Sequence, residues 1–219
     1  PQHRQVVCRT NESLSYGHAP LDIELSRYPD FSAHEPDVYN AQSQGFDSRV
    51  EVDLYAPLDN CRQVYLGMDI GSTSTKAVWM DPEKQVLAGF YTRTAGRPVA
   101  ALCSLLEAMD DLAARKKLNL EIAGVGTTGS GRKFVGRIAG ADRIIDEITA
   151  HARAARELNP DVDTIVEIGG QDSKFTTLKD GQVTFSIMNT VCAAGTGSFL
   201  EEQAEKLGVD LADYAELTR

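Results

Sequence analysis

The chain has 219 residues, of which 42% are hydrophobic and 25% charged, and its formal net charge is −10. This composition is typical of a globular protein with a sizeable core. The acidic balance argues against broad nucleic-acid binding, and no apolar run approaches the roughly 18 residues of a membrane span, so we expect neither partner. Four scattered cysteines are too few for a disulfide framework, which favours a reducing, cytoplasmic setting.

Three segments differ in their patterns. Residues 1–46 are polar and show no helical or strand period, so we expect an irregular leader or linker there. Residues 47–160 carry a first set of strand and helix patterns, and residues 161–219 begin a second set without completing it. Because the chain starts with Pro1 and stops soon after a helix, we expect a piece of a longer protein.

Strand patterns open the first set. Alternation at Val50, Val52 and Leu54 predicts one strand. Further strands, separated by turn residues, are predicted at residues 64–71, 74–81, 85–93 and 120–126. Apolar residues at helical spacing predict helices at residues 98–117 and 146–159, the first with a proline in its opening turn. The second set repeats strand, turn, strand, turn and strand over 164–188, with a helix from about residue 197.

An internal repeat relates the two sets. The stretch DIGSTSTK (69–76) aligns with EIGGQDSK (167–174) at a constant offset of 98 residues. A hairpin and a third strand follow each copy. A repeat at this spacing indicates two topologically similar subdomains rather than a solenoid, whose period is about 20 to 50 residues.

The chemistry of both turns favours phosphate binding. A glycine after a strand lets the backbone approach an anion, and serine or threonine hydroxyls can contact its oxygens. An acidic residue at the strand end can hold Mg²⁺ against that phosphate. Two such hairpins facing each other would grip a nucleotide tail from both sides.

A second glycine pattern points elsewhere but is weaker. Gly124, Gly126 and Gly129 spell GxGxxG after a strand, with Asp146 some twenty residues on, as in a dinucleotide fingerprint. That fingerprint needs a helix opening within the motif, and the stretch TTGSGRK delays any helix by several residues. We therefore do not expect dinucleotide binding.

Five motifs in order carry a specific resemblance: GMDIGSTSTKA, GTTGSGR, ADRIIDEITAHARAA, IGGQDSK and MNTVCAAGTGSFLE, covering roughly residues 64–209. The chain resembles the CoA-substrate-specific activases, namely the activators of 2-hydroxyglutaryl-CoA dehydratase and the ATPase subunits of benzoyl-CoA reductase. The resemblance implies an α/β actin-like (ribonuclease H-like) ATPase fold, here with the first subdomain complete and the second truncated. It also implies a homodimer that uses ATP, Mg²⁺ and one shared [4Fe–4S] cluster to push an electron into an acyl-CoA dehydratase or reductase component.

The resemblance also assigns site residues. In the phosphate motifs and the glycine-rich segment, it points to Asp69, Gly71, Ser72, Thr73, Lys76, Gly129, Glu167, Gly169, Gly170, Gln171 and Asp172. Within that set, the expected catalytic residues are Asp69, Asp172 and Gln171. Asp69 is also the expected Mg²⁺ ligand, and Lys76 is a charge partner. Cys192 is the implied cluster ligand, since a thiolate at a helix N-terminus has a depressed pKa and binds iron readily. The alternative for Cys192 is a packed, inert side chain at a subunit interface.

The chain departs from the family pattern in ways that keep other functions open. Ala150 stands where a second cluster cysteine is usual, and Glu167 stands where an aspartate is usual. We expect His151, next to Ala150, to face solvent or a neighbouring side chain rather than a metal. A cluster-free module used for dimerisation or docking, and a small-molecule kinase of the same superfamily, are the two alternatives.

Overall fold

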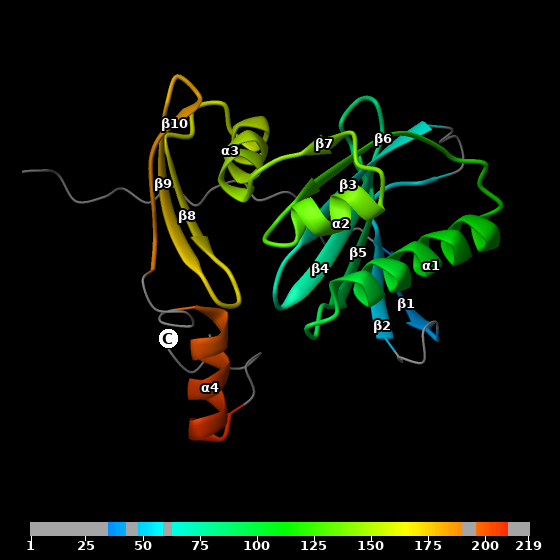
Figure 1. Cartoon of the computed structure of the whole chain (residues 1–219), viewed down its shortest axis with the longest axis horizontal. Coiled ribbons are helices and arrows are strands. Elements are labelled where there is room, and N and C mark those ends of the chain that lie inside the picture. Colours follow the sequence, from blue (N-terminus) through cyan, green and yellow to red (C-terminus); the bar gives the residue numbers. More distant parts are fainter. Residues whose placement is uncertain (1–34, 43–47, 59–62, 190–195, 210–219) are drawn as a thin grey trace, which may run out of the picture. The chain divides into compact units, whose positions relative to one another are not determined.

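The computed structural model describes residues 35–42, 48–58, 63–189 and 196–209, and these residues form two β-sheets with associated helices (Figure 1). No helix in these four ranges is both long and apolar enough to cross a membrane. The predicted α/β character is confirmed.

The larger sheet has seven strands, in the spatial order β1 (Glu35–Ala41), β2 (Ser48–Leu54), β5 (Val86–Arg93), β4 (Ser74–Met80), β3 (Gln63–Ile70), β6 (Glu121–Thr128) and β7 (Arg143–Ile144). Strand β6 pairs in parallel with both β3 and β7, and the other neighbours are antiparallel. The smaller sheet is antiparallel, in the order β10 (Gln182–Met188), β9 (Ser173–Lys179) and β8 (Thr164–Ile168). The helices are α1 (Pro98–Lys116), α2 (Arg132–Ile138), α3 (Glu147–Leu158) and α4 (Gly197–Leu207).

One face of the seven-stranded sheet carries the main core. In β3, alternate residues point to this face, namely Val64, Leu66, Met68 and Ile70, and all four are buried. Helices α1 and α2 contribute buried residues to the same cluster, so both cover this face. Because side chains alternate along a strand, Asp69 projects from the opposite face, away from the core.

The structure corrects the expectation for residues 35–41. They form strand β1, which pairs with β2 along its full length, so the segment expected to be irregular through residue 46 is ordered there. Its sequence EPDVYNA contains residue types that are depleted in strands, and four of its seven residues are exposed. Pairing with β2 and the burial of Ala41 therefore supply what the sequence pattern lacks.

The other predicted elements agree with the observed ones, within a few residues at their ends. The glycine-rich segment after β6 leads into the short helix α2, which begins only at Arg132. Gly124 and Gly126 lie inside β6, so the GxGxxG pattern does not open a helix. The subdomain boundaries placed near residues 46 and 160 stay predictions.

Candidate functional site

The two hairpins of the sequence repeat have the same local geometry. In the first, β3 and β4 pair Asp69 with Lys76, and the Gly71 amide donates a hydrogen bond to the Ser74 carbonyl (3.0 Å). In the second, β8 and β9 pair Glu167 with Lys174. The amide of Gly169 then donates to the carbonyl of Asp172 (2.7 Å). Each atom pair is displaced by the same 98 residues, so the repeat is structural as well as sequential.

The tips of the two hairpins meet. The Ser72 hydroxyl donates a hydrogen bond to Oε1 of Gln171 at 3.0 Å. On the other side, Gly170 lies so close to Thr73 that an added Cβ would be 3.5 Å from the threonine hydroxyl. The 98-residue offset exchanges these two contacts, because Ser72 corresponds to Gly170 and Thr73 to Gln171. The hairpins therefore face each other about a local pseudo-two-fold axis.

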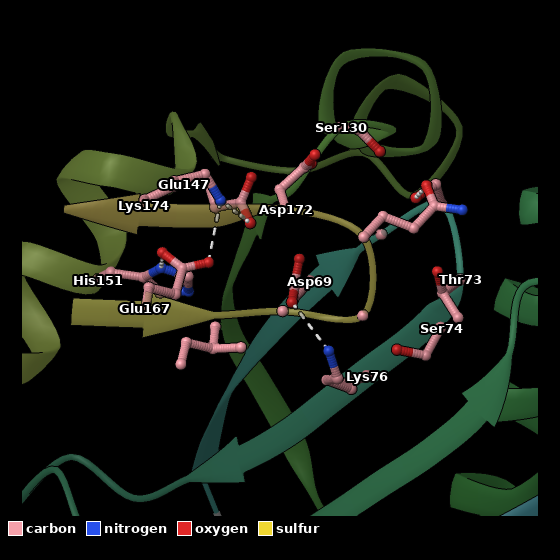
Figure 2. A pocket seen from close by; sticks show the side chains of 16 residues that line it. Asp69, Thr73, Ser74, Lys76, Ser130, Glu147, His151, Glu167, Asp172 and Lys174 are labelled. Carbon is pink, nitrogen blue, oxygen red and sulfur yellow. Dashed lines mark hydrogen bonds and ion pairs between the residues drawn. The ribbon is translucent and has the colours of Figure 1, made fainter. Parts of the chain in front are cut away.

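A cavity of about 260 Å³ lies at this meeting point (Figure 2). It is lined by ten of the eleven residues expected in the phosphate site, all from the hairpins: Asp69, Gly71, Ser72, Thr73, Lys76, Glu167, Gly169, Gly170, Gln171 and Asp172. The eleventh, Gly129, follows β6 and lies behind Asp69. The structure thus gathers the two motifs into one site.

Asp69 has few polar partners within this cavity. Lys76 Nζ lies 3.5 Å from its Oδ2, and half of the lysine side chain is exposed. Its other oxygen, Oδ1, is buried and has no hydrogen-bond partner among the described residues. An unpaired buried carboxylate oxygen is costly, and a cation would satisfy it. The residues at Asp69 therefore fit a bound Mg²⁺.

Gly129 is required by the packing around Asp69. Its φ is +84°, which disfavours residues other than glycine. An added Cβ would collide with Asp69 Oδ1 and lie 2.6 Å from the Ile70 carbonyl oxygen. Gly129 thus lets β6 approach the end of β3 closely enough to confine the Asp69 carboxylate.

Helix α3 supplies a third side of the cavity. Its N-cap is Asp146, whose side chain accepts hydrogen bonds from the amide and the hydroxyl of Thr149 (2.9 and 2.6 Å). These bonds lower the pKa of Asp146 below its ordinary 3.8. The cap fixes the first turn, which presents Glu147 and His151 on one side of the helix, four residues apart.

Glu147 and His151 meet the second hairpin. His151 Nδ1 lies 2.6 Å from Oε2 of Glu167, and Lys174 Nζ lies 2.9 Å from Oε1 of the same carboxylate. Lys174 also contacts Glu147 at 3.1 Å. Burial opposes ionisation of Glu167, but the hydrogen bonds from Lys174 and His151 outweigh it and hold its pKa below the ordinary value. For Lys174, burial disfavours the charge, but the two glutamates prevail and raise its pKa.

Part of the cavity lining was not predicted from the sequence. Ser130, Glu147 and Lys174 line the cavity, and none was expected there as a site residue. The i, i+4 spacing of Glu147 and His151 was the available signal. As expected, His151 faces a neighbouring side chain, Glu167.

The cavity has a net negative lining. Four carboxylates oppose two ammonium groups, which leaves a formal charge of −2 with neutral His151; they belong to Asp69, Glu147, Glu167, Asp172, Lys76 and Lys174. A polyphosphate entering alone would therefore be repelled, and a divalent cation would offset that repulsion.

Cys192 lies outside the described residues. Residues 196 and 197 touch the second hairpin, since the Thr196 hydroxyl donates to the Gly170 carbonyl and the Gly197 amide donates to the Gly169 carbonyl (3.2 and 3.0 Å). Ala150 lines a second cavity, of about 400 Å³ beside β3, β4 and β6, which shares Asp69, Lys76 and His151 with the first. Within the described ranges the single cysteine is Cys103, in α1.

Comparison with known proteins gives relatives with consistent names. The chain is 34% identical over 152 residues to the (R)-2-hydroxyglutaryl-CoA dehydratase activating ATPase of Acidaminococcus fermentans, covering 69% of this chain and 56% of that protein. It is 37% identical over 153 residues to the activator of lactoyl-CoA dehydratase of Anaerotignum propionicum, covering 69% and 57%. The chain thus spans little more than half the length of these relatives.

The chain also matches solved structures of proteins named as dehydratase activators or components. The activator of 2-hydroxyisocaproyl-CoA dehydratase from Clostridium difficile, with bound ADPNP, matches with a TM-score of 0.58 and 34% identity over 68% of this chain and 54% of that one. Component A of the Acidaminococcus fermentans (R)-2-hydroxyglutaryl-CoA dehydratase matches with a TM-score of 0.57 and 32% identity, over 70% and 57%. The predicted actin-like ATPase fold is confirmed. Because the family model matches residues 66–219, the chain belongs to the BadF/BadG/BcrA/BcrD ATPase family.

Proposed function

We propose that the complete protein binds and hydrolyses ATP as an activator of an acyl-CoA dehydratase or reductase component. The observation that carries this proposal is the pair of equivalent hairpins that face each other across one cavity. Relatives named as dehydratase activators, one of them solved with the ATP analogue ADPNP, support it.

In this proposal each hairpin contributes to the phosphate site. Asp69 would hold Mg²⁺ through its carboxylate, and Lys76, beside it, would offset phosphate charge. The hydroxyls of Ser72 and Thr73 and the amide of Gln171 would contact phosphate oxygens from opposite sides. Mg²⁺, when bound, would neutralise phosphate charge and orient the reacting group. A phosphate between the turns would replace the hydrogen bond from Ser72 to Gln171, so binding would separate the tips.

Titration calorimetry of the complete protein tests the ATP-binding step. We expect Mg·ATP to bind, ATP in excess EDTA to bind much more weakly because of the negative lining, and phosphate release to follow without any sugar or acid acceptor. Equal affinity with and without Mg²⁺ would contradict the assigned role of Asp69. No binding at millimolar Mg·ATP would refute the proposal.

The electron-transfer part of the proposal concerns Cys192 and a homodimer. A [4Fe–4S] cluster is normally held by four thiolates, and one cysteine per subunit gives two. Ala150, at the position where the family resemblance implies a second cysteine, has no ligand side chain. Iron and acid-labile sulfide should therefore be measured per dimer after anaerobic reconstitution, beside Cys192→Ala. About four iron atoms, lost in the variant, would support a cluster with further ligands.

Ala150 also favours a second candidate, a cluster-free module that uses the fold for dimerisation or docking. This candidate predicts no iron in either protein, despite correct folding. It also predicts that Cys192→Ala leaves ATP hydrolysis and partner binding unchanged. The iron measurement therefore separates the two candidates.

A further inference from the structure

Four charged or titratable side chains join helix α3 to the second hairpin. Glu147 and His151 come from the helix, and Glu167 and Lys174 come from β8 and β9. Lys174 bridges the two glutamates, and its side chain is only 8% exposed. His151 binds the remaining oxygen of Glu167. These four residues, the α3–hairpin cluster, line the same cavity as the phosphate motifs (Figure 2).

This cluster satisfies Glu167 much more fully than the first hairpin satisfies Asp69. Both oxygens of Glu167 have partners within 2.9 Å, whereas Asp69 has one contact at 3.5 Å and one oxygen without a partner in the described ranges. The backbone at the two positions is equivalent, so the difference comes from the side chains that α3 contributes. Glu167 is therefore suited to a positioning role rather than to holding a cation.

A metal ion in the cluster is disfavoured by its own lysine. Glu147, His151 and Glu167 bring possible ligand atoms within 4.8 Å of one another. The Lys174 ammonium, however, already lies about 3 Å from a carboxylate oxygen of each glutamate. A divalent cation would have to displace a buried ammonium group that these carboxylates hold in its charged form.

Among the described residues, the hydrogen bond from His151 to Glu167 is the shorter of two side-chain links between α3 and the second hairpin. An ionised carboxylate can only accept, so Nδ1 carries the proton and donates to Glu167. Apolar packing contributes little here, because Ala152 is the only buried residue of α3. Lys174 belongs to the same hairpin as Glu167, so its bond to Glu167 cannot fix that hairpin to the helix. Its bond to Glu147 can, at 3.1 Å, but the bond from His151 to Glu167 is shorter, at 2.6 Å.

We propose that His151 is a positioning residue of the phosphate site, which holds Glu167 and thereby fixes the second hairpin turn against helix α3. The inference rests on the proposed ATP binding. Removing the donor leaves a half-buried carboxylate oxygen without its partner, and hydrogen bonds to charged groups are the stronger ones. We expect the turn that carries Gly170 and Gln171 to loosen, and Mg·ATP affinity to fall about tenfold.

The test compares His151→Leu with His151→Asn in the complete protein. Asparagine places an amide N–H close to the position of Nδ1 and keeps the donor without a ring, whereas leucine removes it. Leucine is a better helix former than histidine, so a loss of Mg·ATP affinity in His151→Leu cannot come from a weakened helix. Arg153→Leu, at an exposed position of the same helix, is the matched control.

Two measurements are made on each protein: the Kd for Mg·ATP by calorimetry, and amide hydrogen exchange of residues 147–158 and 168–173 without nucleotide. We expect His151→Leu to weaken binding about tenfold and to speed exchange in the turn. We expect His151→Asn and Arg153→Leu to stay within about twofold of the wild type.

Three results would overturn the inference. If His151→Leu kept the wild-type affinity for Mg·ATP and the wild-type amide exchange, the proposed positioning role of His151 would be refuted. If the asparagine and leucine variants lost affinity equally, packing of the imidazole ring would matter instead of its hydrogen-bond donor. Both leave the proposed function intact. Failure of the wild type to bind Mg·ATP would overturn the proposed function and this inference with it.

Discussion

Gly129→Ala tests the confinement of Asp69 by the end of β6. The change adds one methyl group at a residue whose φ is +84°, in a direction where Asp69 Oδ1 and the Ile70 carbonyl already lie. A side chain in the left-handed region costs about 1–2 kcal/mol, and forcing an atom into a packed site costs about 1–3 kcal/mol more. The free energy of unfolding should therefore fall by about 2–5 kcal/mol.

Two other glycines separate these contributions. Gly140 has a φ of +65° and nothing within 4 Å of an added Cβ, so Gly140→Ala carries the backbone strain without the collision. The net loss there should be at most about 1 kcal/mol, because alanine also restricts the unfolded chain. Gly126 has neither a positive φ nor a close neighbour, so Gly126→Ala should be neutral or stabilise by up to about 1 kcal/mol.

The assay is denaturant unfolding of the three variants, with Mg·ATP titrations on each. A change of 1 kcal/mol shifts the Tm of a domain of this size by about 2–4 °C, so the three variants are separable by thermal unfolding as well. Affinity for Mg·ATP should fall in Gly129→Ala alone, since only that change displaces Asp69. If Gly129→Ala and Gly140→Ala lost equal stability and both kept their affinity, the close approach of Gly129 to Asp69 would be refuted.

Three further changes test the site, the cap and the core. Asp69→Ala should abolish Mg·ATP binding, because the proposed metal anchor is lost; unchanged affinity by calorimetry would contradict that anchor. Asp146→Ala should destabilise the chain by about 1 kcal/mol at neutral pH. Because the hydrogen bonds from Thr149 hold the pKa of Asp146 below 3.8 when folded, its stabilisation is present above that value and is lost as the pH falls through the folded pKa. Urea unfolding at pH 7 and pH 3 should therefore show a smaller difference between variant and wild type at pH 3. Trp79→Ala removes a buried side chain that packs edge-to-face on Phe90 (5.1 Å between centroids), and urea unfolding should show a loss of about 3–5 kcal/mol; a loss below 1 kcal/mol would contradict this packing.

Local patterns predicted much of the fold, because they reflect burial directly. Residues of β3 alternate between the core face and the opposite face, and this period is visible in the letters VYLGMDI. The repeat predicted the paired turns, since a glycine after a strand followed by small polar residues specifies the same hairpin twice. The strand β1 was not predictable in this way, because its residues gain order by pairing with β2.

The α3–hairpin cluster was hidden for a related reason. Glu147 and His151 lie four residues apart, which predicts a shared side of a helix and nothing about what that side meets. Lys174 and Glu167 predict a cross-strand pair within their own hairpin. Only the packing of α3 beside the second hairpin brings these two pairs together, and no local pattern specifies that packing.

The two hairpins of the repeat share their backbone geometry but differ in the partners of their acidic side chains. The same turn hydrogen bond closes both hairpins, and the same acid–lysine register pair stands behind each turn. Asp69 nevertheless keeps one oxygen without a partner in the described ranges, whereas Glu167 has both engaged. A symmetric pair of unpaired carboxylates would increase the negative charge that phosphate has to overcome. Lys174 neutralises the Glu167 carboxylate and His151 fixes its position, so we expect the second hairpin to keep its conformation when phosphate binds. A single divalent cation at Asp69 would then offset the net charge of −2 in the cavity lining. The asymmetry between two equivalent hairpins therefore accounts for how a cavity lined by four carboxylates could accept a polyphosphate.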